Sequence, residues 1–381
     1  MAKILMINLP YSGHTNPTLG LAAELVSRGH YVGYINAESF REKIEATGAS
    51  FIPYDNYPND LTDQQVITRC FSAAYNTALR VGKDYDLILY ELLFYFGRAL
   101  AEKLDKPCIR QFSMFAWNEH VVNTFMSKSP VGYEFSLESI RELVTHDSSH
   151  GIKIKYGEIF SEINHNIPPL NIVYTSREFQ IFSNEFDDRF QFVGPSIAYG
   201  AYRACKCSIP FSEMKPVIIY VSMGTVLGKH KNIYQTCIRA FAKEDVSVIM
   251  SLGKHITKES LGNIPANFYV HESVPQLEVL EKASLFITHG GMNSVNEAIY
   301  FGVPMLVAPI GCDQPTIADR VEELVMGKRI KGDKITPDKI KQLAHTILRE
   351  QKYKQNILKH SDYMKKAGGI HKAADLIEIT L

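Results

Sequence analysis

A histidine close to the start of the chain has the surroundings of a general base. His14 lies in the run Gly13–Pro17, shortly after the apolar stretch Lys3–Leu9, which predicts a buried strand. A helix is predicted from Pro17 to Arg28 with Asn16 as its N-cap, so His14 falls in a loop between a strand and a helix. Side chains in such loops often face a ligand, and histidine exchanges its proton near neutral pH. A histidine that only hydrogen-bonds the turn would give the same pattern.

A second group of polar residues follows the predicted strand Leu285–Thr288. The loop after this strand contains two glycines, and a helix is predicted to open near Asn293. Backbone N–H groups at a helix start attract anions, and His289 and Ser294 could donate to phosphate oxygens. Glu297, one turn along, could accept from ribose hydroxyls. The spacing indicates a nucleotide diphosphate site, although an ordinary strand-to-helix turn would have the same composition. It matches neither the G-x-G-x-x-G motif nor the P-loop.

Two shorter motifs each come at the end of a predicted strand or shortly after it. Asp313 and Gln314 follow the strand predicted at Pro304–Ala308, and a carboxylate beside an amide suits the vicinal hydroxyls of a sugar. An aspartate that caps a helix would explain the same residues. The run Val221–Thr225 (VSMGT) also ends a predicted strand, and its small residues would let backbone and hydroxyl groups approach a phosphate.

Short apolar runs alternate with helical patterns along the chain, which predicts an α/β fold with parallel sheets. We place a linker at about residues 195–215, between a Rossmann-like domain of residues 1–205 and a second one of residues 216–381 with C-terminal helices. Ligands bind at the carboxyl ends of such strands, so the cleft between the two domains is the expected site. The predicted strands are Lys3–Leu9, Tyr31–Ile35, Asp86–Tyr90, Pro107–Phe112, Asn171–Thr175, Val217–Ser222, Val246–Ser251, Phe268–Val270, Leu285–Thr288 and Pro304–Ala308.

The composition excludes several classes of protein. The 381 residues carry 41 basic and 41 acidic side chains, so no net positive field favours nucleic acid or an anionic membrane. The apolar stretches are far shorter than the roughly 20 residues of a spanning helix. The N-terminus lacks the pattern of a signal peptide, and we therefore expect a cytoplasmic protein. Six cysteines without zinc-like spacing predict reduced thiols.

The motifs occur together in an order that carries a resemblance. The segments GHTNPTLGLA, SMGT, VPQLEVL, THGGMNSVNEA and GVPMLVAPIGCDQ follow one another along the chain. In combination they resemble the inverting glycosyltransferases that use UDP-sugars, and most closely the bacterial branch that glycosylates macrolides and flavonoids. The block Ser273–Gln314 is similar to the nucleotide-sugar box of the plant enzymes. The resemblance implies the GT-B fold, two facing Rossmann-like domains with an inter-domain cleft.

The resemblance also implies a catalytic pair. The family's basic histidine falls on His14, which would deprotonate an acceptor hydroxyl as that hydroxyl attacks the anomeric carbon with inversion. An acidic residue at a first-domain strand end orients this histidine in the family, and the matching position is Glu91. The family usually has aspartate there, so the fit of the longer glutamate is in question.

Donor-binding positions follow from the same resemblance. Ser273 stands where many members have a tryptophan that stacks on uracil, which leaves the choice between uridine and thymidine diphosphates open. The expected donor-binding residues are Ser222, Gly224, Thr225, Val274, Gln276, His289, Gly291, Asn293, Ser294, Glu297, Asp313 and Gln314.

The sequence indicates the acceptor-binding residues less clearly than the donor-binding ones. Aromatic and apolar residues near first-domain strand ends are candidates for acceptor binding, although core packing would explain them equally, and the irregular stretch 113–170 is expected to supply acceptor loops. The D-x-D run Asp84–Asp86 is remote from the diphosphate motifs, so we expect neither a metal nor a cofactor. The candidate acceptor residues are Phe94, Phe112, Met114 and Trp117.

The sequence therefore predicts an enzyme that moves a sugar, glucose above all, from a UDP-sugar to a hydroxyl of a hydrophobic small molecule. The alternatives are a UDP-N-acetylglucosamine epimerase or a lipid-linked sugar transferase of the same fold, and a nucleotide-sugar binder without activity. The expected partners are the donor and the acceptor, without nucleic acid or an integral membrane segment. Oligomeric state, acceptor and sugar stay open.

Overall fold

The chain forms two compact units in a computed structural model that describes residues 1–58, 60–61, 63–128, 162–203, 205, 207–224, 231–331 and 335–381. Unit 1 consists of Met1–Arg203 together with Lys366–Leu381, and unit 2 of Ala204–Lys365. The units thus meet in the chain close to the expected linker. The C-terminal segment, however, belongs to unit 1, whereas the sequence placed it in the second domain.

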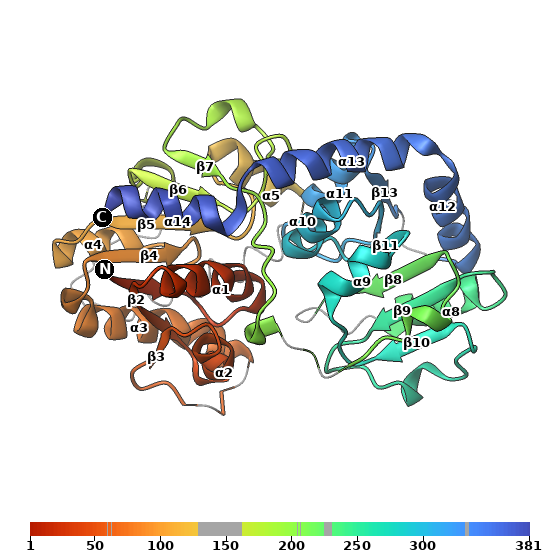
Figure 1. Cartoon of the computed structure of the whole chain (residues 1–381), viewed down its shortest axis with the longest axis horizontal. Helices are drawn as coiled ribbons and strands as arrows, with labels where there is room; N and C mark the ends of the chain where they lie inside the picture. Colours follow the sequence, from red (N-terminus) through yellow and green to blue (C-terminus); the bar gives the residue numbers. More distant parts are fainter. Residues whose placement is uncertain are drawn as a thin grey trace. The chain divides into compact units, whose positions relative to one another are not determined.

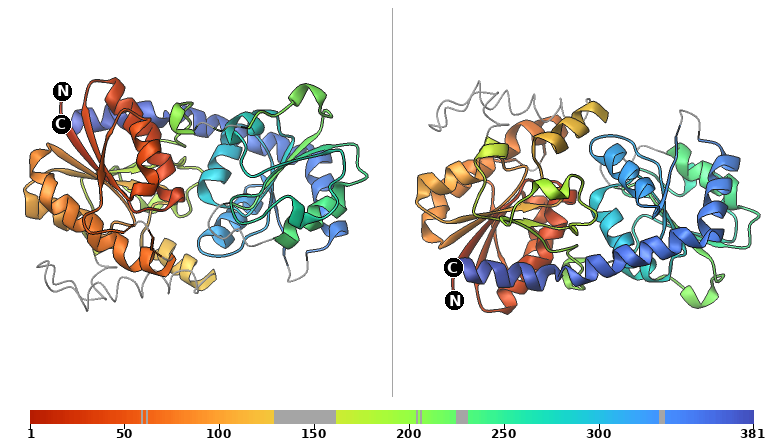
Figure 2. Two further views of the ribbon diagram at one scale, coloured as in Figure 1. Left: turned by 90° about the horizontal axis from the view of Figure 1, so that it is seen from below. Right: turned by 90° about the horizontal axis from the view of Figure 1, so that it is seen from above.

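Unit 1 is built on a seven-stranded parallel sheet in the order β3-β2-β1-β4-β5-β6-β7. The central strands are buried over nearly their whole length, which is typical of a parallel sheet covered on both faces (Figures 1 and 2). The strands are β1 (Lys3–Ile7), β2 (Tyr31–Asn36), β3 (Ser50–Pro53), β4 (Leu87–Glu91), β5 (Cys108–Phe112), β6 (Leu170–Val173) and β7 (Phe190–Phe192).

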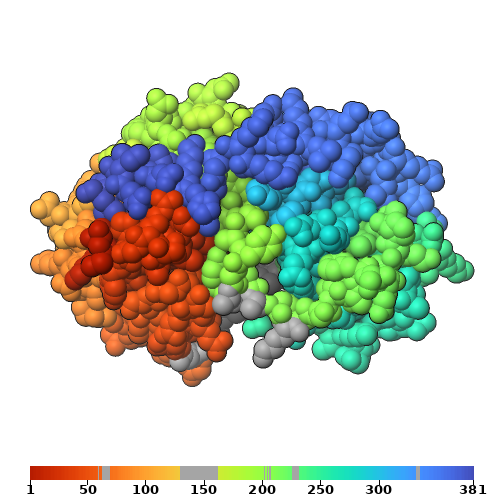
Figure 3. Space-filling view, in the orientation of Figure 1, coloured from red at the N-terminus to blue at the C-terminus, as the bar shows by residue number. Residues whose placement is uncertain are grey.

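The helices of unit 1 include one from the far end of the chain, α14, which packs on α1. Its residues Ala373, Ala374 and Ile377 are fully buried in the same apolar cluster as Leu19 and Leu25 of α1. The space-filling view shows this C-terminal segment on the surface beside the N-terminal one (Figure 3). The helices are α1 (Ser12–Ser27), α2 (Arg41–Glu45), α3 (Asp63–Val81), α4 (Gly97–Leu104), α5 (Glu119–Lys128) and α14 (Gly369–Thr380).

Helix α1 begins more than a turn earlier than the sequence predicts. The backbone N–H of His14 and that of Thr15 both donate to the carbonyl of Tyr11, at 2.9 and 2.8 Å, so the helix starts at Ser12 and Pro17 lies inside it. The predicted N-cap at Asn16 and the predicted loop position of His14 are therefore wrong. Buried side-chain hydrogen bonds hold the early turn in place, among them Thr15 Oγ1 to the carbonyl of Leu9 at 3.1 Å.

Unit 2 contains a six-stranded parallel sheet in the order β10-β9-β8-β11-β12-β13. Helix α12 begins at Pro337, where Thr336 caps it by accepting from the N–H of Lys339. The strands are β8 (Ile218–Ser222), β9 (Ser247–Ser251), β10 (Phe268–His271), β11 (Leu285–Thr288), β12 (Met305–Val307) and β13 (Gly327–Arg329). The helices are α8 (Lys231–Phe241), α9 (Gln276–Lys282), α10 (Met292–Tyr300), α11 (Gln314–Glu323), α12 (Pro337–Arg349) and α13 (Gln351–Lys366).

Among the described residues, no helix has the length and apolar character that crossing a bilayer requires. All six cysteines lie in the described part of the chain and none forms a disulfide there. Burial raises the pKa of the Cys312 thiol to about 11, with the Asp313 carboxylate adding to the shift, so this cysteine is protonated at neutral pH.

Candidate active site

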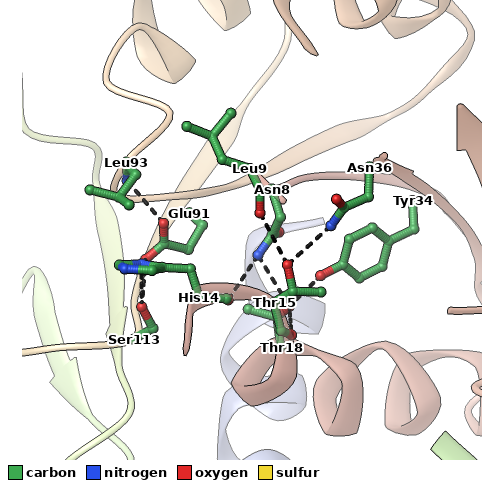
Figure 4. Close-up of polar contacts among 10 residues, drawn as sticks. All are labelled: Asn8, Leu9, His14, Thr15, Thr18, Tyr34, Asn36, Glu91, Leu93 and Ser113. Carbon is green, nitrogen blue, oxygen red and sulfur yellow. Dashed lines mark hydrogen bonds and ion pairs between the residues drawn. The ribbon is translucent and has the colours of Figure 1, made fainter. Parts of the chain in front are cut away.

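Three side chains from unit 1 meet at the carboxyl edge of its sheet (Figure 4). His14 comes from the first turn of α1, Glu91 ends β4, and Ser113 directly follows β5. The Nδ1 atom of His14 lies 2.8 Å from Oε1 of Glu91 and 2.8 Å from Oγ of Ser113. Ser113 Oγ donates to the same Glu91 oxygen at 2.7 Å. The predicted pair of His14 and Glu91 is thus in contact, and the longer glutamate reaches the imidazole.

The neighbouring backbone fixes this group further. Glu91 is completely buried, and its second oxygen, Oε2, accepts from the N–H of Leu93 at 2.9 Å. Asn8 donates through its side-chain amide to the carbonyl of His14 at 3.0 Å, which ties the first turn of α1 to the end of β1. The side chain of His14 remains 19% exposed. The carboxylate is therefore enclosed while the imidazole still reaches solvent.

These contacts decide which nitrogen of His14 can act as a base. A carboxylate only accepts hydrogen bonds, so Nδ1 must carry the proton that it shares with Glu91. The other ring nitrogen, Nε2, then has the lone pair in the neutral form. A negative carboxylate beside Nδ1 stabilises the imidazolium that forms when Nε2 takes a proton. The arrangement can therefore remove a proton from a hydroxyl.

Tyr11 is a neighbour of His14 that the sequence did not single out. The two rings meet edge to face with centroids 6.2 Å apart, and the Tyr11 hydroxyl lies 3.8 Å from Sγ of Cys70. Burial raises the pKa of Tyr11 far above its usual range, so its phenol keeps its proton. Compared with the phenol of Tyr11, the imidazole of His14 is the group suited to accept a proton at neutral pH.

Ser113 is also absent from the sequence-based candidates, although a signal for it exists. The strand order places β1, β4 and β5 side by side, and all three run in the same direction. Residues that directly follow these strands therefore gather at one edge of the sheet. With the strand order in hand, a polar residue immediately after β5 becomes a candidate for the same site as Glu91.

In unit 2, the imidazole of His289 packs closely against two glycines. A Cβ atom on Gly224, which follows β8, would lie 2.7 Å from the His289 ring, and one on Gly291 would lie 2.5 Å from Nε2. Gly290 has a φ of 89°, and its N–H donates to Thr288 at 3.3 Å. Helix α10 begins immediately afterwards, with Gly291 as its N-cap. A cationic or neutral imidazole thus stands beside a helix N-terminus, an arrangement suited to a phosphate group.

A chain of hydrogen bonds orients Glu297, which lies in α10. Gln276 donates through Nε2 to Oε2 of Glu297 at 2.6 Å and to Oγ of Ser294 at 3.4 Å. The side-chain amide oxygen of Gln276, Oε1, accepts from the hydroxyl of Tyr220 at 2.9 Å. Burial raises the pKa of Tyr220, so this hydroxyl stays a donor, and the ring stacks on Phe286 with centroids 4.6 Å apart. The structure therefore brings the predicted residues Gln276, Ser294 and Glu297 together.

The loop between β12 and α11 lies beside the loop that contains the glycines. A Cβ on Gly290 would come within 3.6 Å of the backbone oxygen of Gln314. The side-chain oxygen of Gln314 accepts from the N–H groups of Ile310 and Gly311, at 2.9 and 3.3 Å, which fixes the orientation of its amide. Asp313 is the residue before α11, at its N-cap position.

The remaining donor candidates are placed as follows. Ser222 ends β8, Val274 is buried ahead of α9, and Asn293 lies in the first turn of α10. Thr225 lies outside the described residues. Ser273, at the position of the family's stacking tryptophan, has its hydroxyl 3.5 Å from Sγ of Cys205. At this position the chain therefore has a small polar contact where many family members have tryptophan.

The candidate acceptor residues are all buried. Phe94 is fully buried and stacks on Phe71 with centroids 5.1 Å apart, and Phe112 is fully buried near Phe190 at 6.0 Å. Met114 and Trp117 are 8% and 5% exposed. The structure therefore shows Phe94 and Phe112 as core residues, and a role in acceptor binding stays a prediction for all four. Residues 129–161, within the stretch expected to hold acceptor loops, lie outside the described part of the chain.

Comparison with known proteins decides the family. The sequence profile described as "UDP-glucoronosyl and UDP-glucosyl transferase" matches residues 138–367. The chain is 33% identical to an uncharacterised UDP-glucosyltransferase of Bacillus subtilis, YojK, over 99% of this chain and 97% of that protein. The chain belongs to this family. It is an α/β glycosyltransferase, and its transferase relatives extend beyond Bacillus.

Two further relatives and one solved structure are similar to the chain over nearly its whole length. The NDP-glycosyltransferase YjiC of Bacillus licheniformis is 35% identical over 99% of this chain and 97% of its own. The oleandomycin glycosyltransferase of Streptomyces antibioticus is 27% identical over 100% and 91%. The solved structure of the glycosyltransferase of kitacinnamycin superposes with a TM-score of 0.84 at 30% identity, covering 100% of this chain and 99% of that one. The expected GT-B fold is thereby confirmed, with two parallel-sheet units.

Proposed function

We propose that this glycosyltransferase moves glucose from UDP-glucose to a hydroxyl of a hydrophobic small molecule with inversion of the anomeric carbon. The observation that supports this most is the contact of His14 Nδ1 with the buried carboxylate of Glu91, 2.8 Å apart. Such a pair has little use in a protein that only binds a nucleotide-sugar, because binding requires no proton acceptor.

In this reaction, His14 takes the proton of the acceptor hydroxyl on Nε2 while that oxygen attacks the anomeric carbon. The new bond joins the acceptor oxygen to the anomeric carbon, and the bond from this carbon to the diphosphate oxygen breaks on the opposite face. The imidazolium is offset by Glu91, and UDP carries the electron pair away. Attack on the face opposite the leaving group inverts the configuration.

Unit 2 supports the donor part of the proposal. The N-terminus of α10 and the imidazole of His289 suit the diphosphate, which gains negative charge as the sugar leaves. Glu297, held by Gln276, suits the paired hydroxyls of ribose. We propose uridine as the base because the names of the family profile and of the Bacillus subtilis relative both refer to UDP-linked sugars.

The acceptor class rests on the relatives and on the surroundings of His14. One relative is named as a glycosyltransferase of oleandomycin, a macrolide. The neighbours of the His14 side chain include the aromatic ring of Tyr11. An apolar body that carries one or more hydroxyls is the kind of molecule we propose as acceptor.

The test is product formation by the purified protein. UDP release from UDP-glucose is measured with a panel of phenols, flavonoids and macrolides, and product masses are recorded in parallel. Transfer predicts UDP release together with a hexose mass gain, and a β-linked product as judged by NMR. An α-linked product would contradict inversion, and UDP binding without transfer to any acceptor or from any sugar donor would favour a binding protein.

A matched histidine variant controls this test. His120 of α5 also contacts a glutamate through Nδ1, Glu185 at 2.8 Å, but its side chain is 65% exposed. We expect His14→Ala to abolish transfer with UDP affinity retained, and His120→Ala to behave like the wild type. Equal turnover of the two variants would contradict the assignment of His14 as the base.

A further inference from the structure

We propose that Ser113 is a positioning residue that holds Glu91 and His14 in their working geometry, an inference that rests on the proposed function. Ser113 lies just after β5, is 3% exposed, and touches both members of the pair. Its role would be to act through Glu91 and His14, without contact to the substrate.

The donor and acceptor roles in this triangle can be assigned from chemistry alone. The Ser113 hydroxyl has a single hydrogen, and the carboxylate of Glu91 can only accept, so Ser113 donates to Glu91 Oε1 at 2.7 Å. The lone pairs of Ser113 Oγ are then left for the Nδ1–H of His14 at 2.8 Å. One imidazole hydrogen is thus shared between Glu91 and Ser113. The pair of acceptors fixes the ring rotation and the tautomer together.

A glutamate needs such support more than an aspartate would. It has one more rotatable bond, so its carboxylate can swing away from the imidazole unless other groups hold it. Here the N–H of Leu93 holds Oε2 and the Ser113 hydroxyl holds Oε1. Because Glu91 is fully buried, a donor lost at Oε1 is not readily replaced by bulk water.

The first measurement separates catalytic positioning from a structural role of Ser113. Ser113→Ala should lower kcat by about tenfold, with the KM for UDP-glucose changed by less than about twofold. Ser113→Thr keeps the hydroxyl and should recover most of kcat. The control is Ser176→Ala, which removes an equally buried hydroxyl of unit 1 that accepts from Phe179 N–H at 3.3 Å. If Ser113→Ala and Ser176→Ala leave kcat equally unchanged, or if Ser113→Thr is as slow as Ser113→Ala, the proposal fails.

A double-variant cycle tests whether Ser113 acts through Glu91. Glu91→Asp shortens the side chain by about 1.5 Å, enough to break the contact with Ser113. In that background, Ser113→Ala should change kcat by less than about twofold, against the tenfold expected in the wild type. A tenfold loss in both backgrounds would show that Ser113 does not act through Glu91 and would overturn that part of the proposal, leaving only its direct contact with His14.

A readout without turnover separates this inference from the proposed function. In protein labelled with ¹⁵N-histidine, the hydrogen-bonded Nδ1–H of His14 should give a protected resonance that is absent from His14→Ala. Ser113→Ala should shift this resonance and speed its exchange with water, while Ser113→Thr and Ser176→Ala leave it in place. If the wild type transferred no sugar, the proposed function would fail while this signal still reported on the contact. A resonance unchanged in Ser113→Ala would refute the role of Ser113.

Discussion

Replacement of Gly224 by alanine should weaken nucleotide binding through a displaced His289. The new Cβ would lie 2.7 Å from Cε1 and Nε2 of the imidazole, whereas relaxed contacts between such atoms begin near 3.5 Å. The ring must therefore retreat by about 0.8 Å, which stretches a hydrogen bond of about 2.9 Å to a diphosphate oxygen to about 3.7 Å, beyond bonding distance. Loss of one hydrogen bond to a charged group corresponds to about 1.5–3 kcal/mol, or a UDP affinity about 10- to 150-fold lower.

The same substitution also strains the backbone, and a second glycine controls for that effect. Gly224 has a φ of 76° and Gly253 a φ of 72°, so alanine at either position should cost about 1–2 kcal/mol of stability. A Cβ on Gly253, however, has its nearest atom at 3.5 Å, the carbonyl oxygen of Gly224, which is an ordinary contact. Gly253→Ala thus reproduces the strain without touching the imidazole.

Isothermal titration calorimetry with UDP distinguishes the two effects. Gly224→Ala should bind UDP as weakly as His289→Ala, while Gly253→Ala should bind it within about threefold of the wild type although it melts earlier. If Gly224→Ala and Gly253→Ala have the same UDP affinity, the displacement of His289 does not matter for binding and the reasoning is refuted.

Four further outcomes are expected. Glu91→Gln keeps the shape of the side chain and removes its charge, so kcat should fall at least about 100-fold with the KM for UDP-glucose unchanged; a loss below about threefold would count against the charge pair. Glu297→Gln should raise the Kd for UDP by about tenfold while the affinity for inorganic pyrophosphate stays the same, and a parallel loss of pyrophosphate would contradict a ribose contact. Alkylation of Cys312 by iodoacetamide should still accelerate with each step from pH 8 to pH 10, because the thiol has a pKa of about 11, and a plateau at pH 9 would disagree. A hydrogen bond from Lys341 lowers the pKa of Glu244 below its ordinary value. The contact therefore stabilises the fold fully at pH values above the ordinary pKa, and this stabilisation is lost as the pH falls through the lowered pKa. Glu244→Gln should flatten the decline of the melting temperature between about pH 5 and pH 3.

The central strands of both sheets were predictable, and of the four edge strands only β10 was predicted, at Phe268–Val270. Strands such as β4 and β8 are buried along every residue, so they read as continuous apolar runs. By contrast β3, β7 and β13 lie at sheet edges and have only three or four residues, with solvent-facing polar positions. Short edge strands carry little apolar signal, because only part of their surface is covered.

The position of His14 shows a different limit. Local rules place a proline at the first position of a helix, which led to the predicted start at Pro17. In the structure, side-chain hydrogen bonds of Asn8 and Thr15 hold the helical turn that precedes Pro17, and local helix rules do not anticipate them. The structure brings His14 into contact with Glu91, as expected, but the backbone that carries His14 differs from the prediction. It stands on a helix, where its backbone is held more firmly than in a loop.

Residues that hold a site residue in place through a hydrogen bond were the hardest to predict from the sequence. The motif residues Gln276 and Glu297 stood out by their similarity to a known box, but Tyr220, which donates to Gln276, looks like any apolar strand residue. Ser113 likewise belongs to no motif. Both are recognised only once the sheet order and the direction of each strand are known.

The return of the chain to unit 1 has a consequence for synthesis of the protein. Arg28, which directly follows α1, forms ion pairs with Asp375 and Glu378, and Ala373 and Ile377 fill the adjacent apolar cluster. On the ribosome, the residues that carry His14 and Glu91 emerge before unit 2, whereas the helix that closes their core emerges after it. Unit 1 therefore stays incomplete until all of unit 2 has been synthesised. A stop codon placed between unit 2 and α14 would leave unit 2 whole and remove part of the core that supports His14 and Glu91.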